Sequence, residues 1–353
     1  MANFFSRSII DWHQHNPRLL PWSDKKQDPY QIWVSEIIMQ QTRIEQGAGY
    51  YLRFVERFPT LFILSEATLD EVMRYWQGLG YYSRARNLHV ASKYIVQHLN
   101  GQFPLTYDGL LSLPGIGPYS AAAISSLAYD LPHAVVDGNV KRVIARFCGI
   151  LHSVDDASTH EEIRQLATQF MTGVSPGLFN QAIMNFGSLI CKPQNPDCIY
   201  CPLSKKCYAY QNKSVRSLPF RSKKKVNTVR HFTFFVIRYR GKILLTRRVE
   251  KDIWKGLYVP PILENNSDRA PSVMRIHSFV KKIVGHDHLQ LIATSPIARQ
   301  LLSHQTILGR FLYVKLLSSP SSLADPFVWV SNKSADNFGK PIMVVNMIDR
   351  LSK

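Results

Sequence analysis

The chain has 353 residues, 45% of them hydrophobic, which is enough for about two domains with buried cores. Its 43 Lys and Arg residues outnumber its 25 Asp and Glu residues, and a formal charge of +18 suits a polyanion such as nucleic acid. No apolar run approaches the roughly 20 residues of a membrane span, and Asp11 interrupts the N-terminal apolar stretch that a signal peptide would need. We therefore expect a soluble, cytoplasmic protein without a membrane partner.

The first 210 residues have the pattern of a helical domain. Apolar side chains recur at spacings of three and four residues over 30–46, 69–77, 84–99 and 161–171. Pro and Gly residues separate these segments, as they do between helices.

The composition changes after residue 210. Residues 211–229 are rich in Lys and Arg among polar neighbours, which indicates an exposed basic linker. Residues 231–246 then predict a β-hairpin that turns at Gly241, and 309–316 predict a further strand. We therefore expect a helical domain over 1–210, a linker over 211–229 and a smaller α+β domain over 230–353.

Residues 106–129 predict two helices joined by a tight turn, Leu113-Pro-Gly-Ile-Gly-Pro-Tyr-Ser120. Gly115 and Gly117 permit the turn, and Pro118 suits the first turn of the second helix. Exposed backbone N–H groups at such a helix N-terminus bind a phosphate without reading sequence. We expect a helix-hairpin-helix that holds DNA, with a plain packing corner as the alternative.

Two carboxylic acids have contrasting sequence surroundings. Asp137 stands just before a predicted helix over 140–148, where the helix dipole favours its ionised form, although an ordinary N-cap is the alternative. Glu36 lies in a mostly apolar helical segment, and burial there would hold it protonated as a proton donor. Such a pair is typical of glycosidic-bond cleavage, in which one acid protonates the leaving group and the other stabilises a sugar cation.

Four of the five cysteines lie within 17 residues, as C-x6-C-x2-C-x5-C over 191–207. Four thiolates hold a [4Fe–4S] cluster or a structural zinc ion. Zinc sites usually pair two short C-x2–4-C knuckles, and this run has one, so the pattern favours the cluster. Two disulfides are the remaining alternative and need an oxidising compartment. The candidate ligands are Cys191, Cys198, Cys201 and Cys207.

These features together resemble the helix-hairpin-helix DNA glycosylases that carry an iron–sulfur cluster, and within them the MutY family of adenine DNA glycosylases. The similarity runs over nearly the whole helical domain. Besides the hairpin and the cysteine run, its marks are Leu20-Pro-Trp22, Trp33-Val-Ser-Glu-Ile-Ile-Met-Gln-Gln-Thr42, Gly78-Leu-Gly-Tyr-Tyr-Ser-Arg-Ala-Arg-Asn-Leu-His89, Val136-Asp-Gly-Asn-Val-Lys-Arg142 and Asn180-Gln-Ala182.

The resemblance implies that adenine paired with 8-oxoguanine, or with guanine, is flipped out of double-stranded DNA and excised to leave an abasic site. Glu36 would protonate the adenine, and Asp137 would stabilise the sugar cation. Tyr119 and Asn139 would hydrogen-bond within this site. The implied substrate contacts are Arg18, Trp22 and Gln181 in the pocket, Gln41 and Tyr81 in the base stack, and Thr42 on the 8-oxoguanine side. The implied phosphate contacts are Gly115, Gly117, Arg84 and Arg86.

For the C-terminal domain the resemblance implies a Nudix-like fold that reads the 8-oxoguanine strand. Residues 247–261 are similar to a turn of that domain, and Ser303 and His304 match part of its Phe-Ser-His recognition loop. Two residues depart from the family pattern: Leu302 stands for the aromatic, and Ser23 for the Arg that commonly follows Leu-Pro-Trp. Glu264 is the only Glu after Pro261, so we do not expect the Glu-held Mg²⁺ of a nucleotide-hydrolysing Nudix enzyme.

Three readings of the function stay open on the sequence alone. An adenine glycosylase is favoured. A glycosylase for another mismatched base or for oxidised pyrimidines is the second, but Tyr119 occupies the position of the lysine that endonuclease III uses to nick DNA. A DNA-binding iron–sulfur protein without activity is the third, although binding alone needs neither Glu36 nor Asp137. We expect a monomer, nucleoid-associated if the source is bacterial.

Overall fold

The computed structural model describes residues 2–18, 20–21, 28–222, 227–302 and 304–349, which form two compact units. The helical unit comprises Met1–Glu66 and Asn87–Lys223, and the sheet unit comprises Ala67–Arg86 and Lys224–Lys353. Residues 223–226, within the predicted linker, lie outside the described residues. Nothing in the sequence indicates that residues 67–86 group with the C-terminal part of the chain.

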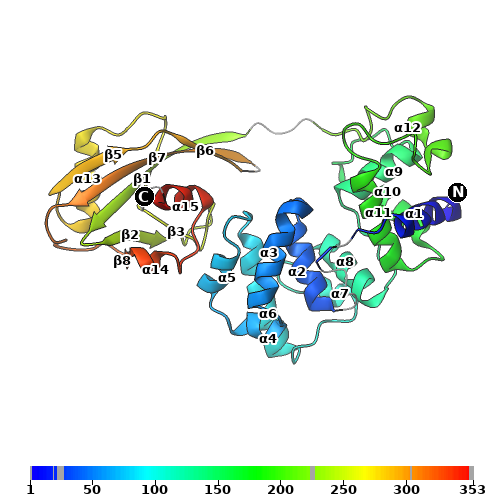
Figure 1. Cartoon of the computed structure of the whole chain (residues 1–353), viewed down its shortest axis with the longest axis horizontal. Coiled ribbons are helices and arrows are strands. Elements are labelled where there is room, and N and C mark those ends of the chain that lie inside the picture. Colours follow the sequence, from blue (N-terminus) through cyan, green and yellow to red (C-terminus); the bar gives the residue numbers. More distant parts are fainter. Residues whose placement is uncertain (1, 19, 22–27, 223–226, 303, 350–353) are drawn as a thin grey trace. The chain divides into compact units, whose positions relative to one another are not determined.

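The helical unit consists of short helices whose ends are set by local sequence. Asp28, Thr106, Asp137 and Ser175 each accept backbone N–H bonds at a helix start, and Pro follows at the first position in three helices. The helices are α1 (Ala2–His15), α2 (Pro29–Met39), α3 (Ile44–Arg57), α4 (Leu61–Glu66), most of α6 (Ser83–His98), α7 (Tyr107–Leu111), α8 (Pro118–Tyr129), α9 (Gly138–Cys148), α10 (Ala157–Met171), α11 (Pro176–Leu189) and α12 (Tyr208–Gln211), with the 3₁₀ turn η2 (Ser204–Lys206) (Figure 1).

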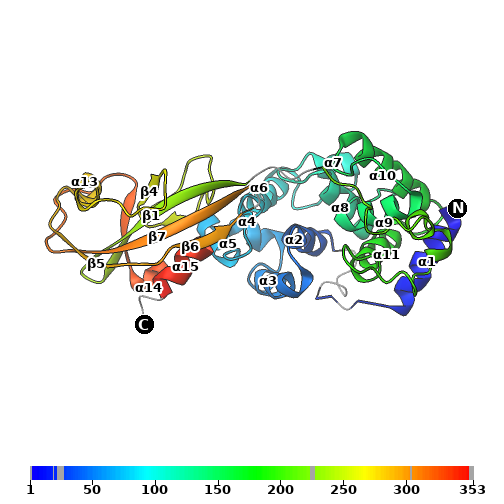
Figure 2. The same ribbon diagram turned by 90° about the horizontal axis from the view of Figure 1, so that it is seen from above.

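The core of the helical unit lies where α1, α8, α9, α10 and α11 meet. Phe5 is fully buried, and its ring stacks on Phe170 with centroids 4.2 Å apart and lies 4.7 Å from Phe147. Figure 2 shows α8 and α9 close to α10 and α11. Because α9 is packed on several sides, the residue at its N-terminus, Asp137, has a rigid support.

The segment over 30–46, predicted as one helical stretch, is interrupted. Helix α2 ends at Met39, and α3 begins at Ile44. Gln41 between them has φ of 60°, a left-handed conformation that breaks a right-handed helix. The predicted pair of helices around the Gly115 turn is confirmed as α7 and α8.

The sheet unit is built on a long mixed sheet in the order β3-β2-β1-β7-β5. Strands β1 (Thr228–Tyr239) and β2 (Lys242–Arg247) form the predicted hairpin, and its turn residues Arg240 and Gly241 both have positive φ, as a type I′ turn requires. The predicted strand over 309–316 is part of β7 (Gln305–Leu316), which runs parallel to β1. The other strands are β3 (Tyr258–Val259), β4 (Ile262–Asn265), β5 (Leu289–Thr294), β6 (Ala298–Leu301) and β8 (Phe327–Ser331).

Helices cover both faces of this sheet. Phe235 and Ile237 of β1 pack against α13 (Val273–Val284), whereas Phe234, on the opposite face, lies with Gly309 near Met343 of α15 (Ile342–Asp349). Helix α5 (Leu69–Tyr75) and the short α14 (Asn332–Ala335) complete the unit. The predicted combination of a helical part and a part with helices and strands is thus confirmed. Among the described residues, no helix is long and apolar enough to cross a membrane.

Candidate active site

Glu36 and Tyr119 form the centre of the candidate site in the helical unit. Glu36 lies on α2 between buried residues, and its Oε2 accepts a hydrogen bond from the Tyr119 hydroxyl at 2.7 Å. Burial raises the pKa of Glu36 to about 7; the Tyr119 hydrogen bond opposes this shift, and the charge of Asp137 adds to it. Glu36 itself is partly buried, and with a pKa of about 7 its carboxyl group can hold a proton near neutral pH.

Asp137 caps the N-terminus of α9. Its Oδ1 accepts the backbone N–H groups of Asn139 and Val140, both at 2.8 Å, and its Oδ2 accepts the Asn139 side-chain amide at 2.8 Å. Burial nevertheless raises the pKa of Asp137, although these hydrogen bonds lower it. Asp137 is thus the N-cap that the sequence offered as an alternative, and desolvation opposes the stabilisation of its ionised form by these bonds.

Three elements bring these groups together. The pKa of Tyr119 is raised well above its ordinary value by burial, by Glu36 and by Asp137. Since Asp137 acts electrostatically on both Glu36 and Tyr119, the side chains from α2, α8 and α9 share one site. Helix α11 contributes Met184, whose sulfur lies 3.8 Å from the Tyr119 hydroxyl. Gln181 precedes Met184 by three residues and therefore shares its helix face.

Arg142 joins this site to the cysteine loop. It is only 6% exposed, and it donates to Asn139 Oδ1 at 2.8 Å and to the backbone carbonyl oxygens of Cys191 and Gly187, both at 2.6 Å. Asn139 in turn donates to Asp137. A continuous path of hydrogen bonds therefore runs from the carboxylate of Asp137 to the backbone of Cys191.

Arg146, one turn further along α9, holds the same loop. It is 3% exposed, and its guanidinium donates to the Cys191 sulfur at 3.4 Å and to the carbonyl oxygens of Lys192 and Leu218, both at 2.8 Å. Arginines on a surface helix ordinarily face solvent. The structure instead buries both arginines, because backbone carbonyls of the loop satisfy them.

The four cysteines of the run are free thiols, each partly buried. Cys191, Cys201 and Cys207 pack against the helical core, and the pKa of Cys201 is raised by burial and by the other three sulfurs. In the described part of the chain, no three side chains of His, Cys, Asp or Glu are grouped as ligands of a single metal ion. Four neighbouring, unpaired thiols match the donor set of a cluster that binds one cysteine at each iron.

The hairpin between α7 and α8 is anchored by Leu113 and Ile116, which are 2% and 5% exposed. Gly115 has φ of +77°, and a Cβ there would collide with the side chain of Asn87. Gly117 is the N-cap of α8, and no side chain caps that helix. The open N–H groups of this helix start are suited to an anion.

Arg18 and Thr42 lie close to the start of α3. Thr42 belongs to residues 40–43, which connect α2 to α3, and Arg18 reaches the first turn of α3. Arg18 donates to Glu45 of α3 at 3.1 Å, and its side chain is 24% exposed. Thr42 is partly buried, and its hydroxyl donates to the carbonyl oxygen of Gln40 at 3.4 Å. Trp22, with its neighbour Ser23, lies outside the described residues.

Gln41 and Tyr81, the expected stack-filling residues, share an unusual backbone. Both are exposed, Tyr81 by 45%, and both have positive φ, at 60° and 47°. Non-glycine residues adopt that conformation rarely, and active sites are among the places where it clusters. The sequence holds no signal for this strain.

Arg84 and Arg86, both in the sheet unit, are only partly exposed. Arg84 lies over the rings of Tyr81 and Trp76, at 5.0 and 5.6 Å, and burial lowers its pKa to about 10. Arg86 donates to the backbone carbonyl oxygen of Lys255. Both guanidinium groups therefore also serve the packing of the sheet unit, besides any contact with phosphate.

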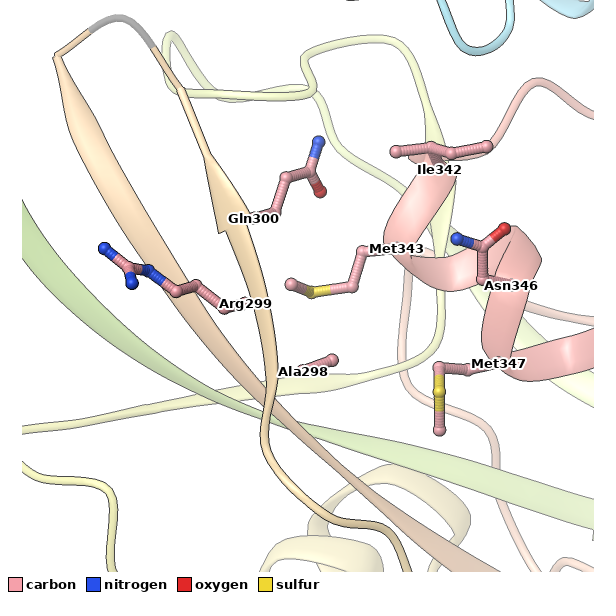
Figure 3. A pocket seen from close by; sticks show the side chains of 7 residues that line it. All are labelled: Ala298, Arg299, Gln300, Ile342, Met343, Asn346 and Met347. Atoms are coloured by element: carbon pink, nitrogen blue, oxygen red, sulfur yellow. The ribbon is translucent and has the colours of Figure 1, made fainter.

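Strands β6 and β7 form a hairpin whose tip carries Leu302 and His304. The Leu302 N–H donates to the Gln305 carbonyl at 2.8 Å, and His304 is exposed, whereas Ser303 lies outside the described residues. Beside this hairpin, a cavity of about 160 Å³ separates β6 from α15 (Figure 3). Gln300, Met343 and Met347 point into it.

Asn180 belongs to the family mark Asn180-Gln-Ala182, but the sequence assigned it no role. It is fully buried on α11, accepts the Val135 N–H at 3.1 Å, and donates to Ser126 Oγ and to the His133 carbonyl, both at 2.8 Å. These bonds fix the segment that leads into Asp137. An Asn within an otherwise apolar helical stretch is the sequence feature that could have indicated this supporting role.

Residues 34–171 match the HhH-GPD superfamily of base excision DNA repair proteins. Among solved structures, a thermostable thymine-DNA glycosylase is similar over 60% of this chain and 97% of its own, with 28% identity and a TM-score of 0.55. A DNA complex of endonuclease III covers 60% of this chain and 98% of its own at 21% identity, with a TM-score of 0.50, and so shares the fold. The helical unit is thus a DNA glycosylase domain of that superfamily.

The curated relatives are more specific. The adenine DNA glycosylase of Buchnera aphidicola from Baizongia pistaciae is 32% identical over 356 residues, covering 99% of this chain and 97% of its own. That of Buchnera aphidicola from Schizaphis graminum is 38% identical over 73% of this chain and 74% of its own. The human adenine DNA glycosylase is 39% identical over 59% of this chain and 39% of its own. The chain belongs to the adenine DNA glycosylase family and is a DNA glycosylase of base excision repair.

Proposed function

We propose that this enzyme removes adenine paired with 8-oxoguanine, or with guanine, from double-stranded DNA and leaves an abasic site. The observation that carries the proposal is the partly buried Glu36, with a pKa of about 7, hydrogen-bonded to Tyr119 and within the electrostatic reach of Asp137. Such a Glu is half protonated near neutral pH and is therefore an effective proton donor to a leaving base.

In the proposed reaction, Glu36 gives its proton to the imidazole nitrogen of the flipped adenine. The bond between the base and the sugar carbon then breaks, and its electron pair leaves with the base. Asp137 stabilises the positive charge on the sugar until water adds to that carbon and releases a proton. Its fixed hydrogen bonds to Asn139 and Val140 hold the carboxylate in one position throughout, which avoids reorganisation during the reaction.

Tyr119 supports a glycosylase that does not itself nick DNA. Strand cleavage through a Schiff base needs an amine that attacks the sugar, and the phenol of Tyr119 supplies none. Its hydroxyl is instead engaged with Glu36 at 2.7 Å. The roles proposed for Arg18, Trp22 and Gln181 in the adenine pocket, and for Gln41, Tyr81 and Thr42 in the DNA stack, follow the family pattern.

Cys191, Cys198, Cys201 and Cys207 would hold a [4Fe–4S] cluster. Their free, neighbouring thiols and the burial of Arg146 beside Cys191 support this assignment. Base hydrolysis transfers no electron, so the cluster would supply a rigid scaffold for the loop and no step of the excision. The exposed Lys205 and Lys206 of that loop suit contact with the DNA backbone.

The sheet unit is proposed to be a Nudix-like domain that reads the 8-oxoguanine strand through residues 302–304. Glu264 and Asp252 do not form an open acidic site, because Arg230 bonds both at 2.8 Å. This supports lesion recognition rather than nucleotide hydrolysis. We propose that the enzyme acts as a monomer on duplex DNA, whose phosphates the net charge of +18 attracts.

The proposal is tested by single-turnover excision on four duplexes. They carry adenine opposite 8-oxoguanine, guanine or thymine, and thymine opposite guanine, and each is assayed with and without alkali. We expect adenine release opposite 8-oxoguanine, with strand breakage only after alkali. The duplex with guanine measures how far Ser23 and Leu302 relax the choice of partner base. Thymine release without adenine release would instead support the thymine-specific alternative.

A further inference from the structure

Gln40 and Ser120 form a second hydrogen bond between the two elements that carry Glu36 and Tyr119. Nε2 of Gln40 donates to Oγ of Ser120 at 2.9 Å. Gln40 stands four residues after Glu36, at the C-terminal end of α2, and Ser120 directly follows Tyr119 on α8. The two bonds therefore link the same pair of helices at neighbouring positions, one within the reactive site and one beside it.

Gln40 is also where the backbone leaves the helix. Its N–H donates to the carbonyl oxygen of Glu36 at 3.1 Å, and its own carbonyl accepts the Thr42 hydroxyl at 3.4 Å. The next residue, Gln41, has the left-handed φ of 60°. Gln40 thus contacts both the last turn of α2, which carries Glu36, and the turn at Gln41 and Thr42 that follows.

Ser120 gives this bond a firm partner. Its side chain is 2% exposed, whereas Gln40 is partly buried, so water does not readily replace the bond. A buried hydrogen bond whose loss leaves a polar group unpaired is more costly to break than an exposed one. The Gln40 side chain is therefore held to α8, and it fixes the end of α2 against the start of α8.

We propose that Gln40 is a positioning residue that, through Ser120, sets both the Tyr119–Glu36 hydrogen bond and the backbone turn of Gln41 and Thr42. A change in the turn at Gln41 and Thr42 then alters the hydrogen bond of Glu36, and a change in that hydrogen bond alters the turn. The consequence for DNA reading rests on the proposed function, because it uses the contacts assigned to Gln41 and Thr42. The effect on Glu36 is independent of which base is excised.

The experiment compares Gln40→Met, which keeps the length of the side chain but cannot donate, with Ser120→Ala and with the double variant. Tyr119→Phe shows the effect of losing the bond to Glu36 directly, and Gln165→Met, at an exposed site on α10, is the control. The titration of Glu36 is followed by ¹³C NMR in the full-length protein labelled at Glu carboxyl carbons, with Glu36→Gln identifying the signal. Melting temperature confirms that each variant is folded.

We expect Gln40→Met to move the Glu36 titration midpoint in the same direction as Tyr119→Phe and to slow single-turnover excision by about five- to tenfold, the effect of one net hydrogen bond. The double variant should match the slower single variant, because both remove the same bond. A folded Gln40→Met protein with an unchanged Glu36 midpoint, or losses that simply multiply, would overturn the proposal. If the parent enzyme released no adenine, the proposed function would fail, but the titration would still decide this inference.

Discussion

Asp137 and Arg142 hold the same side chain from its two ends. The amide nitrogen of Asn139 donates to Asp137 Oδ2, and its amide oxygen accepts from Arg142, both at 2.8 Å. Since Arg142 also bonds the backbone of Cys191, the position of the carboxylate depends on a residue outside the reactive centre. Three side chains spaced along the first turns of one helix thereby form a unit.

This unit predicts the effect of Arg142→Lys. A lysine keeps the charge but cannot reproduce the fork of donors, so carbonyl groups of Gly187 and Cys191 lose partners. We expect a destabilisation of about 2–4 kcal/mol, as for other buried charge networks, together with slower excision. Thermal unfolding and single-turnover kinetics measure the two effects. Arg164→Lys, whose side chain is 50% exposed and pairs with Glu161, should leave both nearly unchanged.

Glu36→Gln removes the transferable proton but keeps the size of the side chain. We expect excision to fall by about 10²–10⁴-fold, the usual contribution of a general acid. Binding to a duplex with a non-cleavable adenine analogue should stay within about threefold, since no ionic contact is removed. Near-normal turnover in this variant would refute the assignment of Glu36 as the acid. Glu161→Gln, on the exposed face of α10, serves as the matched control.

The rate of excision should fall as the pH rises through the Glu36 pKa of about 7, because only the protonated acid reacts. Stability has a related dependence. The folded pKa lies above the ordinary value of 4.5, so the folded state binds the proton more tightly, and its stabilising effect is lost as pH rises from about 4.5 to 7. The melting temperature of the parent should therefore fall relative to that of Glu36→Gln as the pH rises across that range. The same pH dependence in both proteins would show that Glu36 contributes nothing.

The cysteine run predicts iron and sulfide in the purified enzyme. Elemental analysis should give about four iron atoms per chain and no stoichiometric zinc. Cys198→Ser should lower the iron content and weaken the loop that Arg142 and Arg146 hold. Cys148→Ala is the control, because that thiol is partly buried on α9 outside the run. Equal iron loss in both variants, or zinc in the parent, would contradict the cluster.

The sequence predicts the parts of this fold whose signals are local. The β1–β2 turn and the start of α8 depend on Gly241, Pro118 and their neighbours, so they are readable from a few residues. The chemistry of Glu36 is predictable for a similar reason, since an apolar helix segment indicates burial. The fold family then links these features to one function.

Long-range packing explains what the sequence does not predict. Burial raises the pKa of Asp137, and the sequence does not show this desolvation because it depends on helices distant in the chain. Arg142 and Arg146 are buried for the same reason, since their partners lie about 45 residues away, at Gly187 and Cys191. The left-handed backbone of Gln41 has no local sequence signature, because it results from the three-dimensional packing of the chain.

The positive φ angles of Gln41 and Tyr81 also bear on how the enzyme would respond to laboratory evolution. Glycine adopts this backbone without steric strain, so Gln41→Gly or Tyr81→Gly removes a cost of order 1 kcal/mol, partly offset by the entropy of the unfolded chain. Selection for thermal tolerance alone is therefore expected to tolerate glycine at these two exposed positions. Selection for repair activity should retain the Gln41 and Tyr81 side chains. A difference between the two outcomes would show that stability and repair place opposite demands on these positions.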